Sequence, residues 1–299
     1  MSILPKSHSG IWMNTPVKFL GIQSESALGL AQNDSNWRFF GNDVNPISEL
    51  LDVTESYLHQ NPCRTLYAHV KFKVTTEIVS NFHFKHQTPE PDAKLTTLDI
   101  GCSLQMLRRY LNKSIRDLRY IGVDSLPTIY PDILCDVSST AVSQAFKSVK
   151  PDVVIALDLL PTLHDTKTEL TTTLSRWLRA LDEKPSLYVF TIPVCYESGE
   201  HLLKLNNEQW LELLNETFII KDIQAIGFLS ALPYWIGKRL PRGSNGLLQR
   251  SLNSLKNPLY DSNFLQIIES ILTQAFKRTR ILRRYSHSVV VTAFPRSVS

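Results

Sequence analysis

The amino-acid sequence predicts an α/β protein built around a mostly parallel sheet. Through the middle of the 299-residue chain, short apolar segments alternate with segments of helical period, which is the pattern of βαβ units. The apolar run "VVIAL" (153–157) suits a strand that is buried on both faces. Acidic residues stand where several of these apolar segments end. Together these three observations favour an open sheet that is covered by helices on both faces.

The predicted strands are short, apolar and bounded by turn residues; in chain order they are 95–101, 119–124, 131–137, 151–160, 185–194, 218–228 and 286–294. Segments of helical period lie between most of them, at 103–112, 138–149, 166–183 and 206–217. In 166–183, for example, Leu170, Leu174 and Leu181 share one face. Asn206 is a typical helix start signal for the fourth segment.

The two ends of the chain lack this rhythm. The first part holds one predicted helix (46–59), a mixed stretch (66–84) and a polar linker with two prolines (86–94). A second irregular region follows residue 228 and contains the amphipathic segment "SNFLQIIESILTQAF". The predicted division is an N-terminal extension (1–94), a core (95–228), a helical insertion (229–284), and a final core strand with the tail (285–299).

Charge and cysteine content narrow the class of protein. Residues 236–285 hold ten Lys/Arg and two acids, so the net charge of +4 is concentrated there. Such a segment is either a solvated helix face or a contact for an anionic surface. The four cysteines form no CxxC pair and no Cys/His cluster at metal spacing, so neither a disulfide framework nor a metal site is expected. With no apparent signal peptide or bilayer-spanning run, the chain is expected to be soluble and cytoplasmic.

Acidic residues follow four successive predicted strands, at Asp99, Asp124, Asp136 and Asp158. In an open α/β sheet, ligands bind outside the carboxyl ends of the strands. The alternative is that these acids only start turns. Four such positions in succession favour a ligand site.

Three of these positions suggest which groups a ligand carries. Asp124 can accept hydrogen bonds from both hydroxyls of a ribose. Gly101 allows a tight turn and a close approach of the backbone to a ligand. Asp136, with the backbone of Val137, can hold an adenine amino group. The pattern therefore indicates a nucleoside-containing cofactor.

The segments "LTTLDIGCS", "RYIGVD", "DILCDVSS", "PDVVIALDLLPTLHD" and "SLYVFTIPV…EHLLKLNNEQWLELL" resemble the successive motifs of class I S-adenosylmethionine-dependent methyltransferases. The resemblance implies a Rossmann-like, seven-stranded, mostly parallel sheet whose last strand, "SHSVVVTAF", is antiparallel. It implies S-adenosylmethionine as cofactor, with Asp99 and Gly101 at its methionine part and the loop after Leu157 at the methyl-transfer site. The implied cofactor contacts are Asp99, Gly101, Cys102, Ser103, Asp124, Ser125, Asp136, Val137, Leu157 and Asp158.

Two departures from the family pattern affect the expected chemistry. Ser103 and Gln105 stand where the first loop usually has glycines, which argues against a pyrophosphate-binding dinucleotide enzyme. The methionine part of the cofactor has no phosphate and tolerates a looser loop. Pro161 and Thr162 occupy positions that often hold an acid and a histidine in related sequences. The candidates for a general base are therefore His164, two residues further on, and His201, which matches a histidine frequent after the fifth strand.

The predicted function is methyl transfer to a small or medium-sized acceptor, most simply at oxygen, in a metabolite, natural product or glycan. Residues 1–94 and 229–284 would cover the acceptor pocket, with Tyr196, Tyr234 and Trp235 in its wall. One alternative is a binding or scaffold protein that kept the fold and lost the reaction. Another is an RNA methyltransferase, suggested by "KRTRILRR" (277–284) but opposed by the lack of an Asn/Asp-Pro-Pro-aromatic motif. The insertion can also pair with another subunit or rest on an anionic membrane surface.

Overall fold

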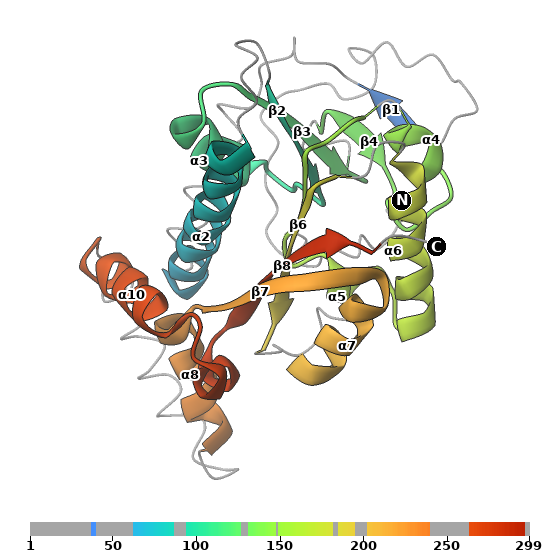
Figure 1. Cartoon of the computed structure of the whole chain (residues 1–299). Coiled ribbons are helices and arrows are strands. Elements are labelled where there is room, and N and C mark those ends of the chain that lie inside the picture. Colours follow the sequence, from blue (N-terminus) through green and yellow to red (C-terminus); the bar gives the residue numbers. More distant parts are fainter. Residues whose placement is uncertain are drawn as a thin grey trace, which may run out of the picture.

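The computed structural model describes residues 37–39, 62–86, 94–126, 131–147, 149–181, 185–194, 202–239 and 263–296. Within them, one sheet of eight strands has the order β1-β4-β3-β2-β5-β6-β8-β7 (Figure 1). The strands are β1 (Trp37–Phe39), β2 (Leu95–Ile100), β3 (Leu118–Asp124), β4 (Ile133–Cys135), β5 (Val153–Ala156), β6 (Leu187–Pro193), β7 (Phe218–Ile226) and β8 (Ser288–Pro295).

The predicted seven-stranded core is confirmed. Strands β4, β3, β2, β5 and β6 are parallel neighbours, and β8 lies antiparallel between β6 and β7. The sequence did not predict β1, which extends the sheet by pairing antiparallel with β4. Strand order reverses between β2 and β5, because β3 and β4 extend to one side and β6 to the other. This switch point is where an open α/β sheet binds its ligands.

The helices are α2 (Pro62–His86), α3 (Met106–Ser114), α4 (Val142–Phe146), α5 (Leu160–Leu163), α6 (Lys167–Ala180), α7 (Asn207–Thr217), α8 (Phe228–Arg239), α10 (Asn263–Phe276) and the 3₁₀ helix η2 (Arg280–Tyr285). Each predicted helical segment of the core overlaps one of them, and α3 runs two residues beyond its predicted segment. Side-chain caps explain two of the starts: Thr166 accepts a hydrogen bond from the backbone of Glu169, and Asn206 accepts one from Gln209. In the described part of the chain, we find no helix with the length and apolarity needed to cross a membrane.

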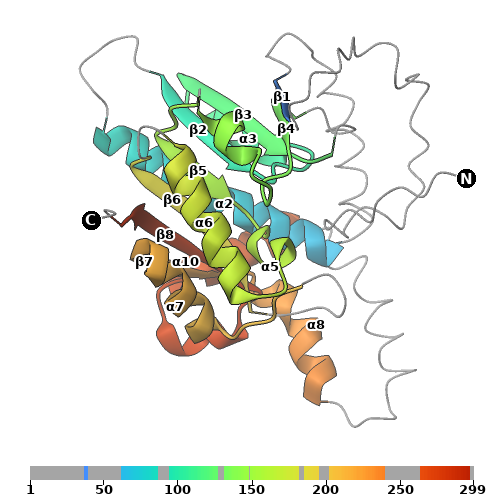
Figure 2. The same cartoon turned by 90° about the vertical axis from the view of Figure 1, so that its right-hand side faces the viewer.

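Two apolar layers hold the helices on the sheet. Helices α4, α6 and α7 cover one face, and α2 and α3 cover the other (Figure 2). The first layer contains the fully buried Trp177 and Trp210. The Trp177 indole also donates a 2.8 Å hydrogen bond to the carbonyl of Val137, which satisfies its buried N–H. Packing on both faces thus fixes the strand ends at the switch point.

Helix α2 is the main difference from the sequence prediction, which treated 66–84 as a mixed stretch. The segment is rich in β-branched valine, threonine and isoleucine, which have only moderate helix propensity. Its helix is stabilised by burial of Leu66, Val70 and Val74, which recur every four residues and face the core. Tertiary packing therefore overrides a weak local signal. The predicted helix 46–59 and residues 87–93 of the predicted linker lie outside the described residues.

Candidate functional site

The loop after β2 keeps a glycine-like backbone at three positions. Gly101, Ser103 and Gln105 have φ values of 73°, 46° and 55°. This left-handed region costs about 1–2 kcal/mol for a residue with a side chain. A Cβ added at Gly101 would lie 2.9 Å from Leu159 Cδ1, so Leu159 would have to shift to make room for a side chain. Ser103 and Gln105 thus replace glycines in sequence while the loop retains the shape that glycines would favour.

A polar network beneath the loop explains how Gln105 is accommodated. Its side chain is buried, and Oε1 accepts a 2.8 Å hydrogen bond from Arg108. Arg108 also forms an ion pair with Asp132 at 3.1 Å and lies over the ring of Tyr120. Asp132 in turn accepts a 2.7 Å hydrogen bond from the backbone of Gly122. Gln105 therefore turns into the protein and supports the loop from below.

The carboxylate of Asp124 lies against this loop. Oδ2 accepts a 3.0 Å hydrogen bond from the Ser103 backbone, and Oδ1 accepts a 3.1 Å bond from Leu126. Burial raises the pKa of Asp124, and these backbone hydrogen bonds oppose the shift. A carboxylate has about four acceptor sites, so these backbone donors leave part of its accepting capacity for a ligand hydroxyl. The neighbouring Ser125 is exposed.

Asp136 and Cys102 differ in their surroundings. Asp136 is exposed past the end of β4, where Oδ1 accepts hydrogen bonds from the backbone and hydroxyl of Ser138 at 2.9 and 2.6 Å. This local turn orients its carboxylate at the same sheet edge as Asp124. Cys102 is buried, and burial raises the pKa of its thiol. A Cβ added at Gly122 would meet Cys102 Sγ at 2.8 Å, so the sulfur fills space inside the fold.

Asp99, at the end of β2, is almost completely buried. The hydroxyl of Tyr120 donates a hydrogen bond to its carboxylate. Burial raises the pKa of Asp99 to about 7, although this hydrogen bond and the charge of Lys71 both lower it. Its side chain can therefore accept or donate a proton near neutral pH.

A second polar network surrounds Asp158, the residue after β5. Its carboxylate forms a 2.6 Å ion pair with Lys71 and accepts hydrogen bonds from the hydroxyls of Tyr67, at 2.7 Å, and Thr191, at 2.6 Å. Burial alone raises its pKa, but Lys71 and these hydrogen bonds outweigh burial and lower the pKa of Asp158 to about 2. Asp158 also has a left-handed backbone, with φ of 56°. Helix α2 is thereby attached to the end of β5.

This second network extends to a histidine that the sequence analysis did not single out. The Tyr67 hydroxyl lies 2.9 Å from Ser288 Oγ, which lies 3.2 Å from Nδ1 of His287. The rings of Tyr67 and His287 are stacked, with centroids 3.9 Å apart. Because β8 is antiparallel, its amino end, just after His287, meets the carboxyl end of β6. That topology was the available signal: a histidine just before the antiparallel last strand lies at the ligand-binding edge.

The other predicted residues are placed as follows. Both ring nitrogens of His164 face α6: Nε2 lies 2.8 Å from Thr173 Oγ1, and Nδ1 lies 3.8 Å from Glu169. Burial lowers the pKa of His164. Leu157 is half-buried in the apolar layer under α2 and α3, and the Trp235 ring contacts Tyr285. His201, Tyr196 and the side chain of Tyr234 lie outside the described residues.

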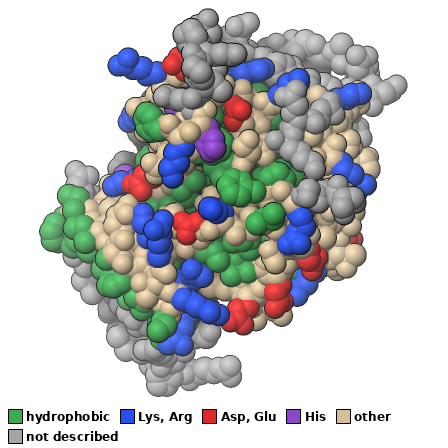
Figure 3. Space-filling model, in the orientation of Figure 1, with side chains coloured by type: hydrophobic (Ala, Val, Ile, Leu, Met, Phe, Trp, Pro, Cys, Tyr) green, Lys and Arg blue, Asp and Glu red, His purple; other side chains and the backbone are tan. Residues whose placement is uncertain are grey.

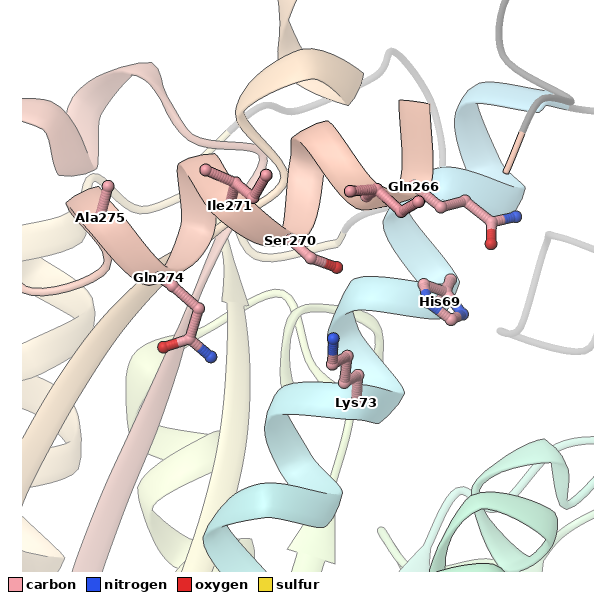
Figure 4. Close-up of a pocket in the computed structure, with 8 residues that line it drawn as sticks. His69, Lys73, Gln266, Ser270, Ile271, Gln274 and Ala275 are labelled. Atoms are coloured by element: carbon pink, nitrogen blue, oxygen red, sulfur yellow. The ribbon is translucent and has the colours of Figure 1, made fainter. Parts of the chain in front are cut away.

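An open groove of about 870 Å³ lies elsewhere, between α2 and α10 (Figure 4). His69 and Lys73 of α2 form one wall, and side chains of α10 form the other. None of the predicted cofactor contacts lines this groove. The strand-end site and the groove are therefore separate features.

Comparisons with known proteins give structural similarities only. No family model and no curated protein matches the chain. Among solved structures, the carbon methyltransferase CurJ is 15% identical, with a TM-score of 0.43, covering 86% of this chain and 72% of that one. The plantazolicin methyltransferase BpumL, determined with SAH, is 16% identical with a TM-score of 0.40, covering 84% and 91% of the two chains.

A third similar structure is magnesium protoporphyrin IX methyltransferase (ChlM) from Synechocystis PCC 6803 with bound SAH. It is 12% identical with a TM-score of 0.38, and the match covers 86% of this chain and 90% of that one. Values this low do not transfer a function. The chain has a Rossmann-like core whose last strand is antiparallel. Class I methyltransferases have the same sheet topology. The function below rests on its own residues.

Proposed function

We propose that this protein is an S-adenosylmethionine-dependent methyltransferase. The observation that supports it is the left-handed loop 101–105 lying against Asp124 at the switch point of the sheet. Asp99 and Asp136 extend this edge on either side of Asp124. The carboxylates of Asp124 and Asp136 suit a cofactor with ribose hydroxyls and amino groups, and they repel a pyrophosphate.

In this proposal each part of the edge holds one part of the cofactor. Asp124 would bind the ribose hydroxyls, and Asp136 with the backbone of Val137 would bind adenine. Gly101, Cys102 and Ser103 would contact the methionine part beside Asp99, while Ser125, Leu157 and Asp158 complete the predicted lining. The bound cofactor supplies an electrophilic methyl group. The chain contributes alignment of the acceptor and exclusion of water, which together supply several kcal/mol, up to roughly ten.

We assign the proton-accepting role to His287. Its Nδ1 lies 3.2 Å from Ser288 Oγ, and the imidazole would take the proton from an acceptor hydroxyl. Tyr67 and Asp158 position the ring through the stacked contact and the hydrogen-bonded chain. A general base adds about 10²–10⁴-fold to such a transfer. His164 is held by α6, and His201 stays a candidate from the sequence.

The proposed acceptor is a small or medium-sized molecule with a hydroxyl group, such as a metabolite, a natural product or a glycan. Residues 1–94 and 229–284 are proposed to cover it. A second candidate function is cofactor binding without transfer, which the side chains of Ser103 and Gln105 in left-handed positions favour. The cofactor site alone does not separate the two candidates.

A transfer screen separates them. The full chain is incubated with methyl-labelled S-adenosylmethionine and with pools of metabolites, glycans and RNA, and label in the acceptor is measured. We expect label in a hydroxyl compound, and His287→Gln should lower its rate at least tenfold while cofactor affinity is unchanged. The matched control, His164→Gln, should leave the rate within about twofold. Cofactor binding with no labelled product in any pool would favour the binding-only protein.

A further inference from the structure

Helix α10 buries two polar side chains and exposes an apolar stripe. Glu269 and Thr273 face inward and are 0% and 1% exposed. Phe264, Ile267 and Ile271 face outward and are 68%, 57% and 60% exposed. A surface helix normally buries its apolar stripe and exposes its polar face. The outward apolar stripe of α10 therefore needs an explanation.

The buried glutamate fixes this orientation. Glu269 Oε1 accepts a 2.8 Å hydrogen bond from the backbone of Phe228, and Oε2 accepts a 2.6 Å bond from Leu229. The Thr273 hydroxyl also donates to Oε1, at 3.2 Å. These backbone groups open α8, so the carboxylate satisfies donors at a helix amino terminus and complements its dipole. Rotating α10 about its axis would leave those backbone donors without an acceptor. The hydrogen bonds of Glu269 therefore keep the apolar stripe facing outward.

Basic side chains lie beside the apolar stripe. Arg280 and Arg284 are exposed in η2, which begins four residues after the last residue of α10. Between them in sequence, Ile281 is 69% exposed. On the other side of the stripe, Lys73 of α2 is exposed along the groove. Figure 3 shows hydrophobic side chains at the edge of the molecule where α10 lies, with lysine and arginine side chains close by. Apolar and cationic groups are thus exposed together.

Among the residues that the structure describes, the acidic groups near this face already have partners or are buried. Glu77 of α2 accepts a 3.0 Å hydrogen bond from Gln274, and Asp222 of β7 lies 3.6 Å from Arg278. Glu269 is buried on the inner side of α10. The outward chemistry of α10 and η2 is therefore apolar and positive, which matches the composition of an interfacial membrane-binding surface.

We propose that α10 and η2 dock on an anionic membrane surface. Phe264, Ile267 and Ile271 enter the boundary between headgroups and acyl chains, and Arg280 and Arg284 contact acidic lipid headgroups. This goes beyond methyl transfer and does not depend on it. A second copy of this chain is the other candidate occupant, and the oligomeric state of the protein distinguishes the two.

Vesicle co-sedimentation of the full chain tests the proposal without cofactor or acceptor. Two vesicle types are used: phosphatidylcholine alone, and phosphatidylcholine with phosphatidylserine in equal parts. We expect binding to the anionic vesicles that weakens as salt is added. Arg280→Gln with Arg284→Gln should weaken it about tenfold or more, since each basic residue near the surface contributes measurably. Ile267→Ser with Ile271→Ser should weaken it at least as much.

Matched control variants distinguish binding through this surface from nonspecific electrostatic or hydrophobic binding elsewhere on the protein. Arg116→Gln with Arg119→Gln removes two exposed arginines near the start of β3, and Ile219→Ser removes an apolar side chain that is 51% exposed on β7. Both controls should bind within about twofold of the unmodified chain. No binding to anionic vesicles, or equal loss in test and control variants, would overturn the proposal. So would a dimer, seen by sedimentation, that Ile271→Ser dissociates, since the stripe would then be a subunit interface.

Discussion

Two partly buried ion pairs, one beside the start of β4 and one after β5, join different parts of the chain. Arg108 and Asp132 are 24 residues apart, and their side chains are 16% and 7% exposed. Lys71 and Asp158 are 87 residues apart, with side chains 13% and 22% exposed. The first pair supports the loop within the core. The second attaches α2 to the edge of the sheet. One pair therefore stabilises a loop close to it in sequence, and the other joins two segments that are far apart in sequence.

The largest effect is expected from breaking the local pair. Arg108→Met removes the partner of Asp132 and of Gln105 together, and loss of a buried ion pair costs about 3–5 kcal/mol. Cofactor affinity should fall as well, because the loop loses its support. Chemical denaturation and calorimetry measure the two quantities. Arg116→Met, at an exposed arginine, is the control; equal stability of both variants would contradict this role of Arg108.

Breaking the long-range pair should cost somewhat less. Lys71→Met is expected to lower the free energy of unfolding by about 2–4 kcal/mol, because Asp158 keeps its hydrogen bonds from Tyr67 and Thr191. The folded-state pKa of Asp158, about 2, lies below its ordinary value of 3.8, so its contribution is complete above pH 3.8 and is lost as pH falls toward 2. Lys71→Met should weaken that acid dependence.

Denaturation at neutral pH and between pH 4 and about 2 checks this prediction. Lys73→Met, at an exposed lysine on the same helix, is the matched control and should keep both the stability and its pH dependence. If the two variants lose stability equally, the ion pair with Asp158 is not what attaches α2.

A smaller effect is expected from Tyr67→Phe, which removes one hydroxyl from the long-range network. The cost in stability should be about 1–2 kcal/mol, since Asp158 loses one hydrogen bond and keeps its ion pair. If Tyr67 positions His287, the methyl-transfer rate should fall while cofactor affinity stays constant. Equal methyl-transfer rates in Tyr67→Phe and the unmodified chain would show that the Tyr67 hydroxyl does not position His287.

The smallest effect is expected at Ser103, in comparison with Gln105. Ser103→Gly should change stability by no more than about 1 kcal/mol, because relief of the left-handed backbone offsets the flexibility of glycine. Cofactor affinity should stay the same or improve. Gln105→Gly has the same backbone relief but loses the bond to Arg108, so it should destabilise by about 1–3 kcal/mol. A tenfold loss of cofactor affinity in Ser103→Gly would make Ser103 a direct contact.

The sequence predicted the parts of the molecule that depend on local pattern. The core strands, their order along the chain, and the acids at their ends follow from apolar runs bounded by turn residues. The sequence also located the altered loop at Ser103 and Gln105. It could not show that both residues keep a left-handed backbone, because that shape depends on contacts with β3 and with Arg108.

The features it missed depend on contacts between distant segments. Helix α2 is rich in β-branched residues, and it is stable because it packs on the sheet and pairs with Asp158. Strand β1 is three residues long and pairs with a strand almost a hundred residues later. The position of His287 follows from the antiparallel direction of β8, which the sequence analysis used for the fold and not for the site.

The central claim is that Asp124 and the loop 101–105 bind S-adenosylmethionine. Titration calorimetry of the cofactor into the unmodified chain, Asp124→Ala and the control Asp117→Ala, at an exposed aspartate before β3, tests it most directly. We predict binding to the unmodified chain and to Asp117→Ala, and binding weaker by at least about 2 kcal/mol in folded Asp124→Ala, since a charged partner of two hydroxyls is lost. No binding to the unmodified chain, or equal affinity in all three proteins, would contradict the claim.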